Sequence, residues 1–453
     1  MVTIMTISNK KETFLLFVGD CVFYFLSLWS VLFIRFGMVP TFSLYMIHAV
    51  PFSILFVIWL LVYYIAGLYD KHTLIITSQL PTIIFNAQVV NSIIAVLFFY
   101  VFPDFGITPK TILFLFVVVS FIVCVFWRVY GVSMLSNQTK ERAILVGSGN
   151  EMKELFERVN HAGTYSIEFI SSINIDDIHD VNVQSDIVQE VYQQGIKLIA
   201  IDFSNEKVRP LLPYLYNLMY AKVRFIDSHK IYEDVFDRIP LSLVTYTWFL
   251  ENISVSQKFT YDFLKRTFDI VLSCILGLIS LVFYPFVICA IYLDDQGKIY
   301  IFQDRIGQNN RLIQIVKFRT MSVDDGGEGD IKRNTRITRV GRFLRMTRID
   351  ELPQLWNVFL GDISLIGPRP ELPNLVKLYE KEINFYNVRH LIKPGLSGWA
   401  QLYQKDPPKF GTDYDQTKIK LSYDLFYIKN RSFWLDLKIA LKTVKTLLSR
   451  SGV

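Results

Sequence analysis

The pattern of hydrophobic residues divides the chain into an almost charge-free N-terminal third and a densely charged C-terminal third. Four apolar stretches occupy residues 13–34, 43–69, 81–102 and 111–130. Each is close to the roughly 20 residues that a helix needs to cross the hydrocarbon core of a bilayer. The pattern predicts a four-helix transmembrane domain over residues 1–135.

Basic residues near the ends of these stretches fall mostly on one side. That side holds Lys10, Lys11, Lys71, Arg128, Lys140 and Arg142, whereas Arg35 and Lys110 lie on the other. Because cytoplasmic loops are enriched in Lys and Arg, the N-terminus and the segment after the fourth helix are expected in the cytoplasm. Asp20 lies within the first stretch, where it either serves a function in the membrane or faces a neighbouring helix or the interface.

A fifth apolar run, residues 270–293, carries no charge. Lys265 and Arg266 precede it, and several arginines follow it, so both flanks have a cytoplasmic character. This favours a re-entrant helix, at about residues 266–294, that enters one leaflet and returns. Pro285 removes a backbone hydrogen bond and marks the expected break. The alternative is an ordinary fifth span, which would place the C-terminal third outside the cell.

Between these apolar regions, residues 140–250 alternate between strand-like and helix-like segments, which predicts a Rossmann-like α/β module. Gly147 and Gly149 suit a helix N-terminus that approaches a phosphate. However, Met152 stands where a dinucleotide-binding fingerprint has its third glycine. Two interpretations therefore stay open, a structural or regulatory module and a nucleotide-binding one.

The composition favours a membrane protein. Hydrophobic residues make up 52% of the chain and charged residues 19%, with a mean hydropathy of +0.33. Soluble proteins average about 25% charged residues. The net charge of +6 is modest for a nucleic-acid-binding protein. The four cysteines lie inside apolar runs without metal-ligand spacing, and the long first apolar run is unlike a cleavable signal peptide.

Residues 333–354 contain six arginines at three-residue intervals, followed by two adjacent carboxylates. The arginines are Arg333, Arg336, Arg339, Arg342, Arg345 and Arg348, and the carboxylates are Asp350 and Glu351. Three residues advance about 300° on an α-helix, so these arginines cannot form one stripe. The first three are expected in a loop or an approach segment, and the last three in a segment leading to the carboxylates. No DNA- or RNA-binding motif accompanies them, which leaves phosphate groups of a substrate or of a membrane surface as partners.

Four motifs follow the fifth apolar run. They are QDRIGQNNRLIQIVKFRTM (303–321), VGRFLRMTRIDELPQLWNVFLGDISLIGPRPE (340–371), KPGLSGWAQL (393–402) and YDLFYIKNRSFWLDLKIALKT (423–443). Together they resemble the bacterial sugar transferase family of polyprenyl-phosphate sugar-1-phosphate transferases, continuously from about residue 261. Four N-terminal helices and a Rossmann-like module resemble the long form of that family.

The resemblance implies a domain at 258–453, mainly helical and anchored by the re-entrant helix, that transfers sugar-1-phosphate from a UDP-sugar to undecaprenyl phosphate and releases UMP. Such a reaction begins exopolysaccharide, capsule or O-antigen synthesis. It implies a multi-pass protein of the bacterial inner membrane with its catalytic domain facing the cytoplasm, and it is compatible with a homodimer. It does not indicate which sugar is transferred.

The resemblance also assigns roles to residues. Asp350 would be the nucleophile that forms a phospho-sugar aspartyl intermediate, and Glu351 would bind Mg²⁺. The residues expected to contact substrate phosphate are Arg345, Lys317, Arg319 and Arg369. The family often has a Ser-Pro pair at the helix break where this chain has Tyr284 and Pro285, and Arg348 replaces a smaller residue.

The same residues make chemical sense on their own. Phosphoryl transfer depends mainly on positioning and on charge neutralisation. Two adjacent carboxylates can divide the work, one attacking phosphorus and one holding Mg²⁺. The neighbouring arginines are expected to lower the pKa of Asp350 and keep it ionised.

Two alternatives belong to other functional classes. A membrane-bound nucleotide-sugar dehydratase would need a Tyr-x-x-x-Lys pair, and Tyr414 and Lys418 have that spacing but follow no glycine fingerprint. A non-catalytic scaffold of polysaccharide export would not need Asp350.

Overall fold

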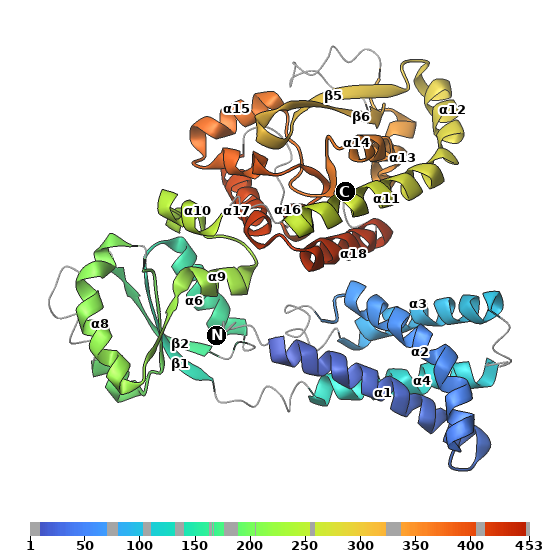
Figure 1. Ribbon diagram of the computed structural model, residues 1–453, viewed down its shortest axis with the longest axis horizontal. Helices are drawn as coiled ribbons and strands as arrows, with labels where there is room; N and C mark the ends of the chain where they lie inside the picture. The colour runs from blue at the N-terminus through green and yellow to red at the C-terminus, as the bar shows by residue number, and fades with distance from the viewer. Residues whose placement is uncertain are drawn as a thin grey trace. The chain divides into compact units, whose positions relative to one another are not determined.

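The computed structural model divides the chain into two compact units, residues 1–236 and 237–453. The residues that it describes are 10–69, 80–102, 110–131, 140–162, 165, 167–175, 189–203, 205–253, 259–322, 337–404 and 413–449. The first unit contains a helical bundle and an α/β module, and the second is a mainly helical domain with short strands (Figure 1).

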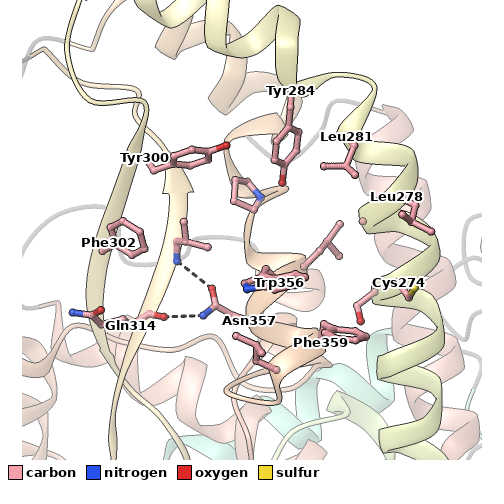
Figure 2. Close-up of a pocket in the computed structure, with 16 residues that line it drawn as sticks. Cys274, Leu278, Leu281, Tyr284, Tyr300, Phe302, Gln314, Trp356, Asn357 and Phe359 are labelled. Atoms are coloured by element: carbon pink, nitrogen blue, oxygen red, sulfur yellow. Dashed lines mark hydrogen bonds between the residues drawn. The ribbon is translucent and has the colours of Figure 1, made fainter.

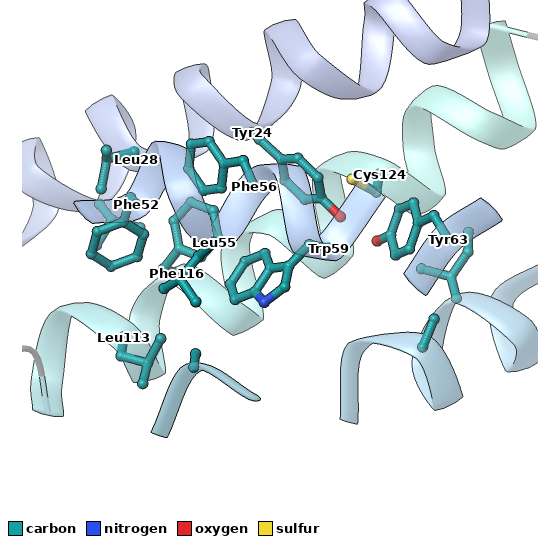
Figure 3. Packing of buried hydrophobic residues seen from close by; sticks show 14 of the residues in the cluster. Tyr24, Leu28, Phe52, Leu55, Phe56, Trp59, Tyr63, Leu113, Phe116 and Cys124 are labelled. Carbon is teal, nitrogen blue, oxygen red and sulfur yellow. The ribbon is translucent and has the colours of Figure 1, made fainter. Parts of the chain in front are cut away.

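The helical bundle consists of α1 (Lys10–Phe36), α2 (Phe42–Ile65), α3 (Leu80–Val101) and α4 (Lys110–Phe126), which continues into a π-helical turn, Trp127–Gly131. The first three helices are long and apolar enough to cross a membrane, and the apolar part of α4 is shorter. Aromatic side chains fill the interior (Figure 3), among them Tyr24, Phe52, Phe56, Trp59 and Phe116. Many large apolar side chains also cover the outside, as expected for helices that face hydrocarbon.

A buried ion pair ties this bundle together. Asp20 of α1 and Arg128 of the π-helical turn are both fully buried and form a salt bridge. The hydroxyl of Tyr69 donates to Asp20 at 2.6 Å, and Arg128 donates to the carbonyl of Leu68 at 2.5 Å. Asp20 therefore faces a neighbouring helix. Arg128, one of the cations used to orient the bundle, is an interior residue because it neutralises Asp20.

The α/β module is built on a parallel sheet with strand order β2-β1-β3-β4. Its strands are β1 (Glu141–Gly147), β2 (Ile167–Asn174), β3 (Leu198–Ile201) and β4 (Arg224–Asp227). Helices α6 (Asn150–Ala162), α8 (Leu212–Leu218) and α9 (Ser228–Phe236) accompany them. Apolar strand residues such as Ile144 and Ile199 are fully buried, which explains the continuous apolar runs in the sequence.

The turn between β1 and α6 carries both glycines singled out in the sequence. Gly149 has φ +91°, a conformation that suits glycine. A Cβ on Gly147 would lie 2.7 Å from Cγ of Met152, whose side chain is buried. The residue that replaces the third glycine therefore packs directly against the turn.

The second unit begins with a short helix, α10 (Tyr246–Asn252), and a bent helix pair, α11 (Phe259–Leu281) and α12 (Tyr284–Asp295). An antiparallel hairpin of β5 (Tyr300–Ile306) and β6 (Leu312–Phe318) follows. Next come α13 (Arg339–Thr347), α14 (Gln354–Leu360), β7 (Ser364–Ile366), α15 (Pro373–Glu382), β8 (Gly395–Ser397), α16 (Trp399–Tyr403), α17 (Tyr414–Asn430) and α18 (Phe433–Ser449). Strands β7 and β8 pair in parallel.

The core of the second unit also contains residues that the sequence pattern grouped with the α/β module. Ile239 and Trp248 are buried in one cluster with Leu425 and Ile439. The indole of Trp399 donates to the carbonyl of Asp237 at 2.9 Å. The segment 237–253 thus packs within the C-terminal unit, because its apolar side chains complete that core.

Helices α11 and α12 meet at an angle of 57°. The last turn of α11 tightens to hydrogen bonds between residues three apart, from Val282 to Ile279 and from Phe283 to Ser280. Pro285 lies in the first turn of α12, where its missing N–H costs nothing. The break therefore falls immediately before the proline.

Both ends of this helix pair are fastened to the same unit. On α11, Arg266 donates to the carbonyls of Val358 and Phe359 at 2.8 and 2.7 Å, and Asp269 accepts from the backbone N–H of Leu365 at 3.0 Å. At the end of α12, Asp295 lies 3.2 Å from the guanidinium of Arg319.

Candidate active site

The two adjacent carboxylates lie in a short 3₁₀ turn, Ile349–Glu351, between α13 and α14. Thr338 caps α13 by accepting from the N–H of Gly341 at 2.9 Å. The helix ends at Arg348, whose φ of +55° is rare for a residue with a side chain. The left-handed residue stops the helix and turns the chain, so the carboxylates stand on a turn rather than on a continuous helix.

Gly341 allows this helix to approach the segment after β6. A Cβ at this position would lie 2.0 Å from the carbonyl oxygen of Thr320. The side chain of Thr320 in turn accepts from Nε of Arg345 at 2.9 Å. The close packing therefore joins the KFRTM motif to the helix that leads into the carboxylates.

Glu351 is surrounded by three cations. Its carboxylate lies 2.8 Å from the guanidinium of Arg369, 3.7 Å from Nζ of Lys317 and 3.7 Å from Arg348. Burial opposes ionisation, but the charges of Arg369 and Lys317 prevail and lower the pKa of Glu351 to about 2. Glu351 is therefore ionised at any physiological pH.

Asp350 behaves in the opposite way. Burial and the adjacent charge of Glu351 raise its pKa, and Lys317 and Arg345 offset only part of that shift. The expectation that arginines would lower this pKa is wrong, because the nearest cations contact Glu351 instead. The environment thus shifts the pKa values of two neighbouring carboxyl groups in opposite directions, as in sites where such groups have different roles.

A small polar cavity of about 20 Å³ adjoins these residues. Its lining includes Arg305, Lys317, Gln354 and Arg369. Burial and the neighbouring charges of Arg369 and Arg305 lower the pKa of Lys317 to about 8. Nε2 of Gln354 is buried and donates to no atom in the described part of the chain. Three cations and a free amide donor make this cavity suited to an anion.

The arginine run is divided by the structure. Arg333 and Arg336 lie outside the described residues. Arg339, the last residue of the expected loop or approach segment, already begins α13, because Thr338 caps the helix one residue earlier. Arg339, Arg342 and Arg345 are exposed and Arg348 is partly buried. Of these, Arg345 donates to Thr320, and Arg348 lies 3.7 Å from Glu351.

Arg319 is placed differently from Lys317. It is 8% exposed, and its guanidinium contacts both the carboxylate and the carbonyl oxygen of Asp295, at 3.2 and 3.3 Å. Its described contacts thus hold the end of α12 and do not reach the two carboxylates.

Sequence reasoning missed the residue that positions Arg369. The fully buried Arg389 donates to the carbonyl oxygen of Arg369 at 2.9 Å and lies 2.8 Å from Asp424. It also lies 3.6 Å from Glu371, which pairs with Lys420. Arg389 stands outside the four quoted motifs, so no local signal in the sequence marked it.

The residues fit a metal only in combination with a substrate. The described residues contain no group of three or more His, Cys, Asp and Glu side chains that could hold a metal. Mg²⁺, however, commonly takes one or two carboxylates and completes its shell with phosphate oxygens and water. Asp350 and Glu351 match that smaller requirement.

The Tyr-x-x-x-Lys pair of the dehydratase interpretation forms no site. Tyr414 begins α17 and packs its ring against Tyr379, with ring centroids 6.1 Å apart. The side chain of Lys418 is half exposed and lies 3.5 Å from Asp415. Tyr414 therefore packs against the core of the C-terminal unit, and Lys418 lies on its surface.

A family model described as bacterial sugar transferase matches residues 260–450. The chain is 43% identical over 198 residues to the UDP-N-acetylgalactosamine-undecaprenyl-phosphate N-acetylgalactosaminephosphotransferase of Aeromonas hydrophila, an alignment that covers 42% of this chain and 45% of the relative. It is 38% identical over 188 residues to the undecaprenyl-phosphate glucose phosphotransferase of Komagataeibacter xylinus, with 40% and 35% covered.

A shorter relative is covered almost completely. The exopolysaccharide production protein PSS of Rhizobium leguminosarum bv. phaseoli is 38% identical over 195 residues, which are 41% of this chain and 96% of that protein. The chain spans less than half the length of the two relatives named before it. The residues that the family model matches, 260–450, include Asp350 and Glu351.

Proposed function

The chain belongs to the bacterial sugar transferase family, and from that premise we propose that it transfers sugar-1-phosphate from a UDP-sugar to undecaprenyl phosphate. The products would be UMP and undecaprenyl-diphosphate-sugar, the first membrane-bound intermediate of a surface polysaccharide. The observation that carries the proposal is the pair Asp350 and Glu351, with opposite pKa shifts, beside a cavity lined by three cations.

Asp350 would act as the nucleophile. Its carboxylate oxygen attacks the phosphorus next to the sugar, the bond between the two phosphates breaks, and UMP leaves with the bridging oxygen. A phosphate oxygen of undecaprenyl phosphate then attacks the same phosphorus and releases the carboxylate. Partial burial supports this role, because a poorly solvated carboxylate is a stronger nucleophile than one in water.

Glu351 would hold Mg²⁺ together with substrate phosphates. When bound, Mg²⁺ would neutralise charge that develops on the phosphate oxygens. Ionisation of Glu351 at all physiological pH values supports this assignment. Without Mg²⁺, Arg369 and Lys317 neutralise the carboxylate of Glu351, so they are already placed to contact phosphates that bind there.

The remaining phosphate contacts follow from the cavity. Lys317, Arg369 and Arg305 would bind phosphate oxygens, and the free donor of Gln354 would contribute a directional hydrogen bond. Arg345 stands at the edge of this group, held by Thr320. Arg319 would act on the substrate only indirectly, through the end of α12.

The bent helix pair would be a re-entrant membrane helix. A spanning segment must place its ends on opposite sides of a bilayer, but α11 and α12 are both fastened to one compact unit, through Arg266 and Asp295. The apolar residues on both sides of the bend would then enter one leaflet. A re-entrant helix would keep the catalytic unit on one side of the membrane, and the proposal assigns that side to the cytoplasm of a bacterial inner membrane, where UDP-sugars are made.

The α/β module would be a Rossmann-like module with a structural or regulatory role. The parallel sheet supports a Rossmann-like assignment. The side chain of Met152, packed against Gly147, supports a role other than dinucleotide binding at that turn.

The experiment that tests the function uses the full-length protein in detergent or nanodiscs. It is incubated with undecaprenyl phosphate, Mg²⁺ and each member of a panel of UDP-sugars, and UMP and lipid-linked sugar are quantified. We expect one or a few UDP-sugars to yield equal amounts of both products. Asp350→Asn should lose at least about a thousandfold of the rate, as expected for loss of a nucleophile. Equal UMP release by Asp350→Asn would refute the assignment of the nucleophile.

A further inference from the structure

A second cavity, large and apolar, lies beside the proposed active site. It has a volume of about 630 Å³, within the range of small-molecule binding sites. Three walls enclose it (Figure 2): the β5–β6 hairpin with Tyr300 and Phe302, helix α11 with Leu278 and Leu281, and helix α14 with Trp356. Tyr284 closes one end.

Some residues that line this cavity are close in the sequence to the carboxylates and to the cations around them. Pro353 lines it and follows Glu351 by two residues, so their Cα atoms are at most about 8 Å apart. Val316 also lines it and precedes Lys317, whose Nζ lies 3.7 Å from Glu351. A molecule that reaches from Lys317 to Val316 would pass from a cationic to an apolar environment.

The β5–β6 hairpin separates these two environments, because the side chains along each strand alternate between its two faces. Successive residues of a strand point to opposite faces of the sheet. Arg305, Ile315 and Lys317 line the small cationic cavity, whereas Phe302, Gln314 and Val316 line the large apolar one. Strand β5 pairs with β6 so that Phe302 lies opposite Val316, which places both side chains on one face of the hairpin.

The backbone along the apolar wall is already satisfied. The side chain of Asn357 accepts from the N–H of Val316 at 3.1 Å and donates to the carbonyl oxygen of Gln314 at 2.8 Å (Figure 2). Unpaired backbone groups against hydrocarbon would be costly. Asn357 removes that cost, so the wall can face an apolar chain.

The cavity also opens toward the apolar surface that the bent helix pair presents. Leu278, Leu281 and Trp356 are each more than half exposed, at 63%, 54% and 62%. Arg266 fastens α11 to the last turn of α14, which holds two of the walls together.

From this arrangement we propose that the apolar cavity binds the isoprene units of undecaprenyl phosphate nearest its phosphate. The inference rests on the proposed function and assigns the acceptor's chain to a defined place. The acceptor is an amphiphile. The hairpin presents its cationic face to the phosphate end of the acceptor and its apolar face to the hydrocarbon end. The cavity then selects an acceptor with a hydrocarbon chain next to the phosphate and orients that phosphate toward Asp350.

The test uses a position where the cavity can be filled without a clash. A Cβ on Gly277 would meet no atom within 4 Å among the described residues, and Gly277 lines the cavity. Gly277→Trp should raise the KM for undecaprenyl phosphate at least about tenfold, because each excluded CH₂ group weakens binding about fourfold. The KM for the UDP-sugar should change less than about twofold. The matched control is Ile279→Trp, which adds the same side chain to an exposed position of α11 outside the cavity.

A second readout does not require catalysis. Cys274 and Cys289 are both exposed, but Cys274 lines the cavity and Cys289 of α12 does not. Undecaprenyl phosphate should slow alkylation of Cys274 by N-ethylmaleimide and leave Cys289 unchanged, as measured by peptide mass spectrometry. Phosphatidylglycerol at the same concentration should not protect Cys274.

The outcomes separate the inference from the proposed function. Protection of Cys274 without UMP release from any UDP-sugar would support the lipid site and refute the transfer reaction. Normal transfer by Gly277→Trp together with an unprotected Cys274 would overturn the lipid site alone. Equal protection by phosphatidylglycerol would also overturn it, because the cavity would then bind any bilayer lipid.

Discussion

Two clusters of opposite charges, one in the helical bundle and one in the C-terminal unit, contain the same groups in different proportions. In the bundle, one carboxylate meets one guanidinium, both are fully buried, and Tyr69 and Leu68 complete their hydrogen bonds. In the C-terminal unit, two half-buried carboxylates meet an excess of cations and a buried amide donor that has no partner in the described part of the chain. The first cluster is complete by itself, whereas the second has capacity for an anionic ligand.

The comparison shows how to distinguish structural from functional charges in one chain. A buried pair that neutralises itself stabilises a fold only while both partners remain. A surplus of charged side chains of one sign at a partly accessible site needs an external partner of opposite charge. Four predictions test this distinction, starting with the largest expected effect.

Removing one partner of the bundle pair should destabilise the protein. Arg128→Leu leaves Asp20 as an uncompensated buried charge, which should lower the free energy of unfolding by about 3–5 kcal/mol. The double variant Asp20→Leu with Arg128→Leu should recover most of that loss, because no unpaired charge remains. Thermal unfolding in detergent measures both. A double variant as unstable as the single one would show that the pair is needed for more than charge balance.

Removing a charge from the second cluster should affect catalysis instead. Glu351→Gln should reduce kcat by about a hundredfold to a thousandfold and raise the Mg²⁺ concentration needed for half-maximal rate, because one metal ligand loses its charge. UMP release over a Mg²⁺ titration measures the change. An unchanged Mg²⁺ requirement would contradict the assignment of Glu351 as a ligand.

The contact behind Arg369 should have a smaller effect. Arg389→Lys keeps the charge near Asp424 but loses the forked geometry that also reaches the carbonyl oxygen of Arg369. We expect a loss of about tenfold to a hundredfold in kcat/KM for the UDP-sugar. Steady-state kinetics would measure this loss, and thermal unfolding would check that the variant is folded. The effect should fall away in an Arg369→Ala background, since both residues would act through one contact.

The pH profile should show the smallest effect, about tenfold per pH unit. Asp350 attacks as a carboxylate, and its pKa is raised, so activity should be present above that pKa and fall as the pH drops through it. Glu351, with a pKa of about 2, should not titrate in this range. In Glu351→Gln the acidic limb should move to lower pH, because the adjacent like charge is gone. An acidic limb that stays in place would mean that burial alone sets the pKa of Asp350.

Much of the architecture could be predicted from periodicity. The apolar stretches in the N-terminal third are the bundle helices, and the bend in the fifth run falls beside Pro285. The alternation of the middle segment predicted an α/β module, and the structure has a four-stranded sheet with helices there. These features depend on the local sequence, which sets the length, period and breaks of an element.

Pairing between distant residues could not be predicted in the same way. Arg128 looked like a surface cation until the structure placed it against Asp20, 108 residues away. Lys317 and Arg319, two residues apart in one motif, contact different carboxylates. Arg389 lies outside the motifs and acts through a backbone carbonyl. Gln354 lies inside a motif, but its role depends on a buried donor that has no partner among the described residues, which the sequence does not show.

The sequence by itself determined the apolar helices, the order of the motifs, the family and the adjacent carboxylates, since each of these is written in contiguous residues. Only the tertiary structure decided which cation neutralises which carboxylate, in which direction the pKa of Asp350 shifts and where an apolar cavity meets a cationic one. The physical reason is that burial and Coulomb interactions depend on distances through space, and folding brings together residues that lie far apart along the chain.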